Sequence, residues 1–226
     1  MERQLILTGD GSHSFSVPEL NVGYRSIHGA IQESRHIFIE AGFYGFGFFP
    51  QPGPYKIFEL GFGTGLNALL TLMESEKIHA QIRYETIEPF PLNEQEVKAL
   101  NYCHRLNRAE LQNIFEQMHS CEWGGEVAIT ENFFLTKKKT PFFDFTTRQH
   151  FNLIYFDAFA PGAQPELWTK EVFDKVYSLL DPGGILVTYS SKGDVRRAII
   201  AAGFEVEKLP GPPHKREIIR AKKYHN

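Results

Sequence analysis

The clearest signal for the fold is the stretch Tyr55-Lys-Ile-Phe-Glu-Leu-Gly-Phe-Gly-Thr-Gly-Leu-Asn67. Its apolar run, Ile57 to Leu60, predicts a buried strand, and a helical pattern begins at Leu66. Between the two lie three glycines spaced two apart, which allow a sharp turn and let a ligand approach the backbone beside the positive end of the helix. The stretch therefore predicts a strand, a glycine turn and a helix that together bind a small polar ligand.

This motif lacks the residues of two common phosphate-binding loops. A dinucleotide fingerprint needs glycine where this chain has Leu66, and a phosphate loop needs a lysine after Gly65. Instead Glu88 ends the next apolar run, about 20 residues beyond the glycines, where a carboxylate accepts hydrogen bonds from ribose hydroxyls. A glycine triplet alone can be a plain turn, but together with Glu88 it favours a nucleoside cofactor.

The composition excludes several classes of protein. At 226 residues the chain suits one domain with a modest extension. No apolar run approaches the ~20 residues of a membrane span, and the first residues do not resemble a signal peptide, so we expect a cytoplasmic protein. Cys103 and Cys121 lack the spacing of a zinc site or a disulfide framework, and no metal is expected. The net charge of −3 restricts any RNA contact to a local basic patch.

Strand and helix patterns alternate from residue 55 onward, which is typical of a parallel sheet with helices on both faces. We predict a Rossmann-like α/β fold with a mostly parallel, seven-stranded sheet over residues 55–226 and a hairpin-and-helix extension over residues 1–54. Strands are predicted at 55–60, 82–88, 133–137, 151–156 and 185–189, followed by a hairpin over 204–220. Helices are predicted at 66–77, 92–100, 107–121, 165–180 and 194–202, with a turn at 182–184. The extension is predicted to hold a hairpin over 3–17, a helix over 29–41 and a loop over 42–54.

Ligands of open parallel sheets bind beyond the carboxyl ends of the strands. Asp157 ends the apolar run 151–156 and opens the short loop Asp157-Ala-Phe-Ala-Pro161, which is placed where an acceptor would lie beside the cofactor. The structural alternative for Asp157 is a loop-capping carboxylate. Phe159 and Pro161 either form a pocket wall that packs against a base or anchor the loop.

The strings Phe58–Asn67, Tyr155–Pro161, Asp181–Gly184, Val195–Arg197, Ala202–Phe204, Lys215–Glu217 and His28–Ser34 carry a specific resemblance that covers most of the chain. They resemble the methyltransferase domain of MnmC, the bifunctional enzyme of tRNA wobble-uridine modification, and its stand-alone counterparts. The resemblance implies a class I methyltransferase that depends on S-adenosylmethionine (SAM). The implied reaction methylates the aminomethyl group of 5-aminomethyl-(2-thio)uridine at the wobble position of tRNA and gives 5-methylaminomethyl-(2-thio)uridine.

The resemblance also implies roles for single residues. The cofactor-binding set would be Glu59, Gly61, Gly63, Gly65, Asn67, Glu88 and Asp157, with the glycines around the methionine part of SAM and Glu88 on its ribose. Asp157 would also face the amine, which has an unperturbed pKa near ~10.4 and must lose a proton before it can attack the methyl group. Asp157 would accept that proton directly or through water. The residue that contacts adenine is not assigned, because the region after 133–137 has lysines where this superfamily often has an acid.

A late set of basic residues is the candidate contact for the anticodon stem-loop: Lys192, Arg196, Arg197, Lys215 and Arg216. A solvated face is the alternative. The bifunctional enzyme carries a second, FAD-dependent oxidase domain that makes the amine, and we expect no FAD in this chain of 226 residues. A separate oxidase, an ammonia-dependent route or other upstream wobble-modification enzymes would then supply the substrate.

Two other functions remain open. The same fold with SAM can act on a small-molecule or protein amine, as the related aminopropyltransferases do, but such enzymes need acids to hold a polycation. A non-catalytic RNA-binding module is expected to lose the glycine triplet or Asp157, and this chain keeps both.

Overall fold

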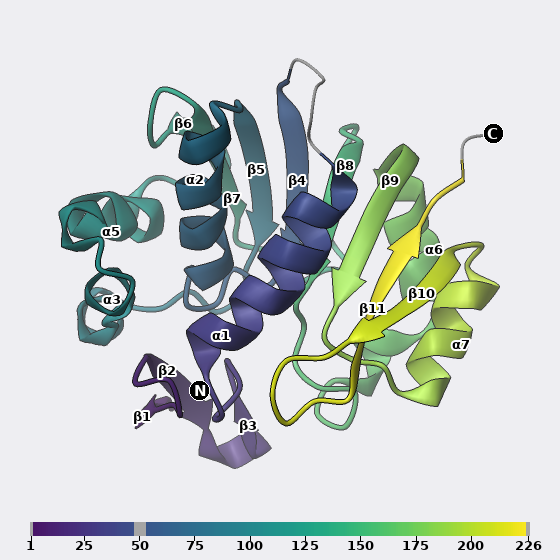
Figure 1. The fold of residues 1–226 in the computed structure, drawn as a ribbon, viewed down its shortest axis with the longest axis horizontal. Coiled ribbons are helices and arrows are strands. Elements are labelled where there is room, and N and C mark those ends of the chain that lie inside the picture. The colour runs from purple at the N-terminus through teal and green to yellow at the C-terminus, as the bar shows by residue number, and fades with distance from the viewer. Residues whose placement is uncertain (1, 48–52, 225–226) are drawn as a thin grey trace.

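A mixed eight-stranded sheet forms the centre of the computed structural model, which describes residues 2–47 and 53–224 (Figure 1). Its strand order is β10-β11-β9-β8-β4-β5-β7-β6. Strands β9, β8, β4, β5 and β7 run parallel to one another, whereas β6 and β11 run antiparallel to their neighbours. The strands are β4 (Tyr55–Leu60), β5 (Ile82–Ile87), β6 (Glu126–Ala128), β7 (Phe133–Lys138), β8 (Phe151–Phe156), β9 (Leu180–Thr188), β10 (Glu205–Pro210) and β11 (Glu217–Lys222).

Helices cover both faces of this sheet. One face carries α1 (Ala30–Ser34), η2 (Arg35–Tyr44), α2 (Leu66–Ile78), α3 (Glu94–Ala99), α4 (Tyr102–Arg105) and α5 (Gln112–Ser120). The other face carries α6 (Lys170–Leu179) and α7 (Gly193–Ala201) (Figure 1). Short 3-10 turns are η1 (Pro18–Leu20), η3 (Ala109–Leu111) and η4 (Pro165–Trp168). The predicted Rossmann-like α/β fold is confirmed.

The apolar run of β4 is buried on both sides, as expected for a central parallel strand. Ile57 packs into the core layer below α2, while Phe58 and Leu60 pack into the layer below α6. Glu59 therefore points toward the α2 side, because successive side chains alternate across a strand.

The sheet differs from the prediction in two places. The structure adds β6, a three-residue strand with no buried residue, which is too short to show a hydrophobic period. Pro182 to Gly184, predicted as a turn, lies within β9. The pairing of β8 with β9 shifts register between Phe151 and Leu153, and Gly183 adopts a φ of +78° in this irregular part of the strand.

The N-terminal residues form a small sheet and a helix. Strands β1 (Gln4–Leu7) and β2 (His13–Val17) pair antiparallel around the Asp10-Gly11 turn, as predicted, and β3 (Val22–Gly23) adds to β2. The helix α1 continues as the π-helix η2 to Tyr44 and so extends into the predicted loop 42–54, of which residues 48–52 lie outside the described part. Gly42 lets η2 approach the sheet, since a Cβ there would lie 2.9 Å from Val187 Cγ2. The domain boundary at residue 54 stays a prediction.

The order of strands creates the place for a ligand. From β4 the chain steps to β5 and β7 on one side, and then returns to β8 on the other side of β4. The loops that follow β4 and β8 therefore diverge and leave a crevice at the carboxyl ends of the strands. The small N-terminal sheet lies at this end of the molecule (Figure 1). None of the described helices is both long enough and apolar enough to cross a membrane.

Candidate active site

A cavity of about 720 Å³ opens at the carboxyl ends of β4, β5, β8 and β9. This volume lies in the roughly 300–1,000 Å³ range of small-molecule sites. Its lining comes from residues 20–27, the ends of β4 and β5, the loops 141–143 and 157–160, the start of η4, and the side chains of Glu33, Tyr189 and Lys215. The described residues contain no group of three or more His, Cys, Asp or Glu side chains that could hold a metal ion.

The floor of the cavity is backbone in a conformation that favours glycine. Gly61 and Gly63 have φ values of +93° and +52°, which L side chains rarely adopt. A Cβ at Gly61 would lie 3.1 Å from the backbone oxygen of Asp157, and a Cβ at Gly63 would lie 3.1 Å from Cδ1 of Tyr24. The turn therefore brings the Asp157 loop and the Tyr24 ring against the glycine loop.

Glu88 joins the glycine loop to the end of β5. One carboxylate oxygen accepts a hydrogen bond from the Gly63 amide at 2.8 Å, and the other accepts one from the Phe90 amide at 2.8 Å. Burial raises the pKa of Glu88, although these two backbone hydrogen bonds lower it. Each oxygen keeps a second lone pair for a hydroxyl donor. The buried acceptor, the glycine floor and the start of α2 fit the ribose and amino-acid parts of SAM.

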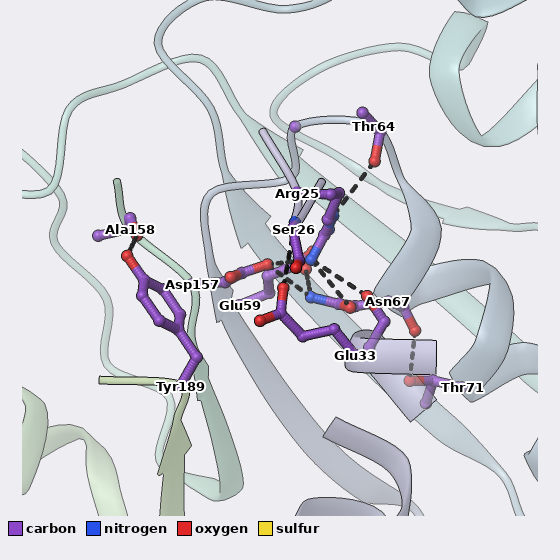
Figure 2. Close-up of polar contacts among 12 residues, drawn as sticks. Arg25, Ser26, Glu33, Glu59, Thr64, Asn67, Thr71, Asp157, Ala158 and Tyr189 are labelled. Carbon is purple, nitrogen blue, oxygen red and sulfur yellow. Dashed lines mark hydrogen bonds and ion pairs between the residues drawn. The ribbon is translucent and has the colours of Figure 1, made fainter. Parts of the chain in front are cut away.

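Asp157 is held by a network of buried polar side chains (Figure 2). Its Oδ2 pairs with Arg25 Nη1 and accepts a hydrogen bond from Asn67 Nδ2 at 2.9 Å. Arg25 Nη1 also donates to Asn67 Oδ1 at 3.2 Å, and Arg25 Nε donates to Thr64 Oγ1 at 3.4 Å. The side chains of Arg25 and Asp157 are 3% and 11% exposed. The network thus engages Oδ2 of Asp157, a residue that also lines the cavity.

Burial controls the charge of the two acids in this network. It raises the pKa of Asp157 to about 6, against the opposing effect of the Arg25 cation. Burial also raises the pKa of Glu59, which accepts a hydrogen bond from Asn67 Nδ2 at 2.9 Å, to about 8. At neutral pH Asp157 is therefore mostly a carboxylate, whereas Glu59 is mostly protonated.

The opposite wall of the cavity combines aromatic rings with one ion pair. Tyr24 meets Phe159 edge to face, with 5.3 Å between ring centroids. The hydroxyl of Tyr189 donates to the Ala158 carbonyl at 2.8 Å. Lys215 Nζ lies 2.9 Å from Glu33 Oε1 in an ion pair within this wall. Side chains from the N-terminal extension and the C-terminal hairpin thus complete the site.

The structure brings part of the predicted site together. Gly61, Gly63, Glu88, Asp157, Phe159 and Lys215 line the cavity. Glu59 and Asn67 lie behind Asp157, and Gly65 packs against His119 of α5. Outside the lining are Pro161, Lys192, Arg196, Arg197 and Arg216. Lys192 precedes α7, and Arg196 and Arg197 lie on that helix. The roles assigned to all these residues stay predictions.

Sequence reasoning missed several residues of the cavity. Tyr24 and Arg25 follow β3 in an irregular segment with no hydrophobic period, and Glu33 has the pattern of a residue on a helix surface. For Glu33 the sequence did hold one signal, because this residue lies in His28–Ser34, one of the strings that carry the family resemblance. Phe90 and Phe143 also line the cavity, with 53% and 57% of their surfaces exposed. No pattern in the sequence predicted that these two aromatic side chains would be exposed at the cavity.

Known proteins are similar to this chain in sequence. The bifunctional protein MnmC of tRNA 5-methylaminomethyl-2-thiouridine biosynthesis from Pseudomonas savastanoi pv. phaseolicola is 30% identical over 211 residues, which is 87% of this chain and 31% of that protein. The protein of the same name from Chromobacterium violaceum is 31% identical over 208 residues, covering 86% of this chain and 31% of that protein. The chain thus spans about a third of the length of the curated relatives it matches.

Solved structures agree on the fold. The crystal structure of MNMC2 from Aquifex aeolicus matches with a TM-score of 0.80 and 22% identity, over 99% of this chain and 71% of that one. Spermidine synthase from Thermotoga maritima matches with a TM-score of 0.51 and 12% identity, over 100% of this chain and 73% of that one. A family model described as S-adenosyl-L-methionine-dependent methyltransferase matches residues 103–224. With that match and a cavity that fits the cofactor, the chain belongs to the SAM-dependent methyltransferase family.

Proposed function

We propose that the chain is an N-methyltransferase that converts 5-aminomethyl-(2-thio)uridine at the tRNA wobble position into 5-methylaminomethyl-(2-thio)uridine. The observation that carries the proposal is the largely buried Asp157 carboxylate, which is held through Oδ2 and lines the cavity beside the glycine floor. The names of the MnmC relatives support the choice of substrate. Because those relatives are about three times as long, the proposal covers the methylation alone.

The chain's own residues would hold the cofactor around the glycine loop. Gly61 and Gly63 would face its amino-acid part, and Glu88 would accept hydrogen bonds from its ribose. Phe90 and Phe143, which line the same cavity, would pack against adenine. When bound, SAM supplies an electrophilic sulfonium methyl group.

Asp157 and Arg25 would prepare the acceptor. An alkyl amine with a pKa near ~10.4 is mostly ammonium at pH 7, and freeing its lone pair costs roughly 4–5 kcal/mol. Asp157 Oδ1 would take the proton, so that one N–H bond breaks, one O–H bond forms and the nitrogen becomes neutral. The Arg25 cation disfavours a second positive charge nearby and so lowers the pKa of the amine, while it also lowers the pKa of Asp157 and makes that carboxylate a weaker base. The neutral nitrogen then has the lone pair that methylation needs.

The contacts with tRNA would extend from the cavity over the surface. Phe159 and Tyr24 offer aromatic faces at the lining for an extruded uracil. Lys192, Arg196, Arg197, Lys215 and Arg216 would meet phosphates of the anticodon stem-loop. Such a substrate implies a cytoplasmic enzyme, and a separate oxidase or another upstream wobble-modification enzyme would supply the amine.

The experiment that tests this proposal is methyl transfer from labelled SAM to two pools of tRNA. One pool comes from cells blocked at the aminomethyl stage, and the other comes from cells that lack the side chain altogether. We expect labelled methylaminomethyluridine from the first pool only, identified by nucleoside mass analysis. If neither pool is labelled while SAM still binds, tRNA is not the substrate and small amines become the acceptors to test.

A further inference from the structure

Lys215 lines the cavity, although it is far in sequence from most of the other residues there. Lys215 belongs to the loop between β10 and β11, and its Nζ lies 2.9 Å from Glu33 Oε1. The same Nζ lies 4.4 Å from the centroid of the Tyr189 ring. A primary alkylammonium is thus held by one carboxylate and one aromatic face, a combination that recognises organic cations.

Both groups that hold this ammonium are positioned by contacts that do not involve Lys215. The Ser26 amide donates to Glu33 Oε2 at 3.2 Å, and the Tyr189 hydroxyl donates to the Ala158 carbonyl at 2.8 Å (Figure 2). Glu33 is also the more buried partner of the ion pair, with 16% of its side chain exposed against 27% for Lys215. The carboxylate and the ring are therefore each held by other contacts, and Lys215 is the more exposed partner of the ion pair.

Glu33 and Tyr189 lie next to the proposed proton acceptor. The negative charge of Glu33 raises the pKa of Asp157, and the charges of both acids add to the effect of burial that raises the pKa of Tyr189. In Figure 2, Glu33 and Asp157 point toward the same space around Arg25. A cation bound between Glu33 and the Tyr189 ring is therefore close to the carboxylate that would deprotonate it.

We propose that Glu33 and the ring of Tyr189 form the subsite for the substrate's aminomethyl ammonium, and that Lys215 occupies this subsite until the substrate enters. The inference rests on the proposed function. One primary ammonium replaces another in this exchange, so the half-buried Glu33 carboxylate keeps a cation beside it throughout. The displaced Lys215 ammonium becomes free to meet an RNA phosphate.

The same subsite would give the enzyme selectivity among wobble side chains. A carboxymethylaminomethyl group carries its own carboxylate, which Glu33 and Asp157 would repel. A hydroxymethyl group has nearly the same size but no charge, and it gains nothing from the carboxylate or the ring face. Glu33 is therefore a specificity-determining residue for an unsubstituted primary amine.

The test measures equilibrium binding of two nucleosides, 5-aminomethyluridine and 5-hydroxymethyluridine, to the full chain saturated with S-adenosylhomocysteine. We expect the wild type to prefer the amine and Glu33→Gln to lose about tenfold of that preference, since the variant keeps shape and hydrogen bonding but not charge. Lys215→Met removes the competing ammonium and is expected to tighten amine binding several-fold. Methyl transfer to tRNA by the same variant is expected to weaken, because the phosphate contact is lost.

Lys208→Met is the matched control, since Lys208 lies on the same hairpin in an ion pair with Glu217 that is not part of the cavity. It should leave both nucleoside affinities unchanged. Equal preference in wild type and Glu33→Gln, with melting temperatures alike, would overturn the proposal, as would weaker amine binding by Lys215→Met. Failure of the wild type to methylate aminomethyl tRNA would instead refute the proposed function, and nucleoside binding would still report on the subsite.

Discussion

The two halves of the cavity are built in different ways. In the cofactor half, the Gly63 amide donates to Glu88 across 25 residues of sequence, within one strand-helix-strand unit. In the acceptor half, Arg25 and Asp157 are 132 residues apart, and Glu33 and Lys215 come from opposite ends of the chain. The first half relies on backbone conformation and the second on buried charged side chains. A binding loop can therefore be local in sequence, while the chemistry beside it depends on contacts across the whole fold.

The largest expected effect is in the acceptor half. Asp157→Asn, or Asp157→Ala, should lower kcat for aminomethyl tRNA by about 10²–10⁴, the usual contribution of a positioned general base. SAM affinity, measured by calorimetry, should change little because Glu88 and the glycine floor are intact. Asp174→Asn, at an exposed position on α6, is the control. Near-normal turnover in the Asp157 variants would remove this residue from the mechanism and break the division into two halves.

The next effect concerns the stability of the acceptor half. Arg25→Met should lower the free energy of unfolding by about 3–5 kcal/mol, because it leaves Asp157 buried without its cation. Lys98→Met breaks the solvent-exposed pair with Glu94 and should change the free energy of unfolding little, because solvent screens this pair. Urea unfolding of both variants tests the contrast. Equal losses would mean that the buried charges are not what distinguishes this half.

The variant Glu59→Gln tests whether Glu59, the buried acid between the two halves, is protonated. The test compares how the stability of the variant and of the wild type depends on pH. Burial raises the folded-state pKa of Glu59 to about 8, so the folded chain binds more protons than the unfolded chain between about pH 4.5 and 8. The stability that protonated Glu59 contributes is fully present below the pKa of Glu59 in the unfolded chain. It is lost as pH rises through about 8, the pKa in the folded chain. Between pH 6 and 8.5 the wild type should lose about 2 kcal/mol relative to Glu59→Gln, measured by urea unfolding at each pH. Parallel pH profiles would contradict a protonated Glu59.

The smallest expected effect is in the cofactor half. Gly63→Ala places a Cβ 3.1 Å from the Tyr24 ring at a φ of +52°, and should weaken SAM binding about tenfold through a shifted loop. Gly162→Ala adds a Cβ that meets nothing within 4 Å and should leave binding unchanged. Calorimetric titration with SAM compares the two. If the two variants bind SAM equally well, the glycine loop tolerates a side chain at position 63. The cofactor half would then depend less on glycine than its geometry indicates.

Local sequence patterns are enough to predict the α/β fold and the position of the crevice. The run Ile57 to Leu60, the glycines and the start of α2 are local signals with a fixed geometry, and Glu88 and Asp157 each follow a buried strand. Because parallel strands end at one edge of a sheet, the sequence alone predicts that these two acids meet at the cavity, as they do. Their roles in binding and proton transfer stay predictions.

Only the tertiary structure decided what surrounds Asp157. Arg25 and Glu33 lie in segments where the pattern of apolar and polar residues is the same whether a charged side chain faces water or a cavity. Lys215 lies in a loop that has no hydrophobic period. The three meet Asp157 and Tyr189 because the N-terminal segment and the loop between β10 and β11 both reach the cavity at the carboxyl ends of the parallel strands. The raised pKa values of Asp157 and Glu59 have the same origin, since burial in a low-dielectric interior depends on packing rather than on residue type.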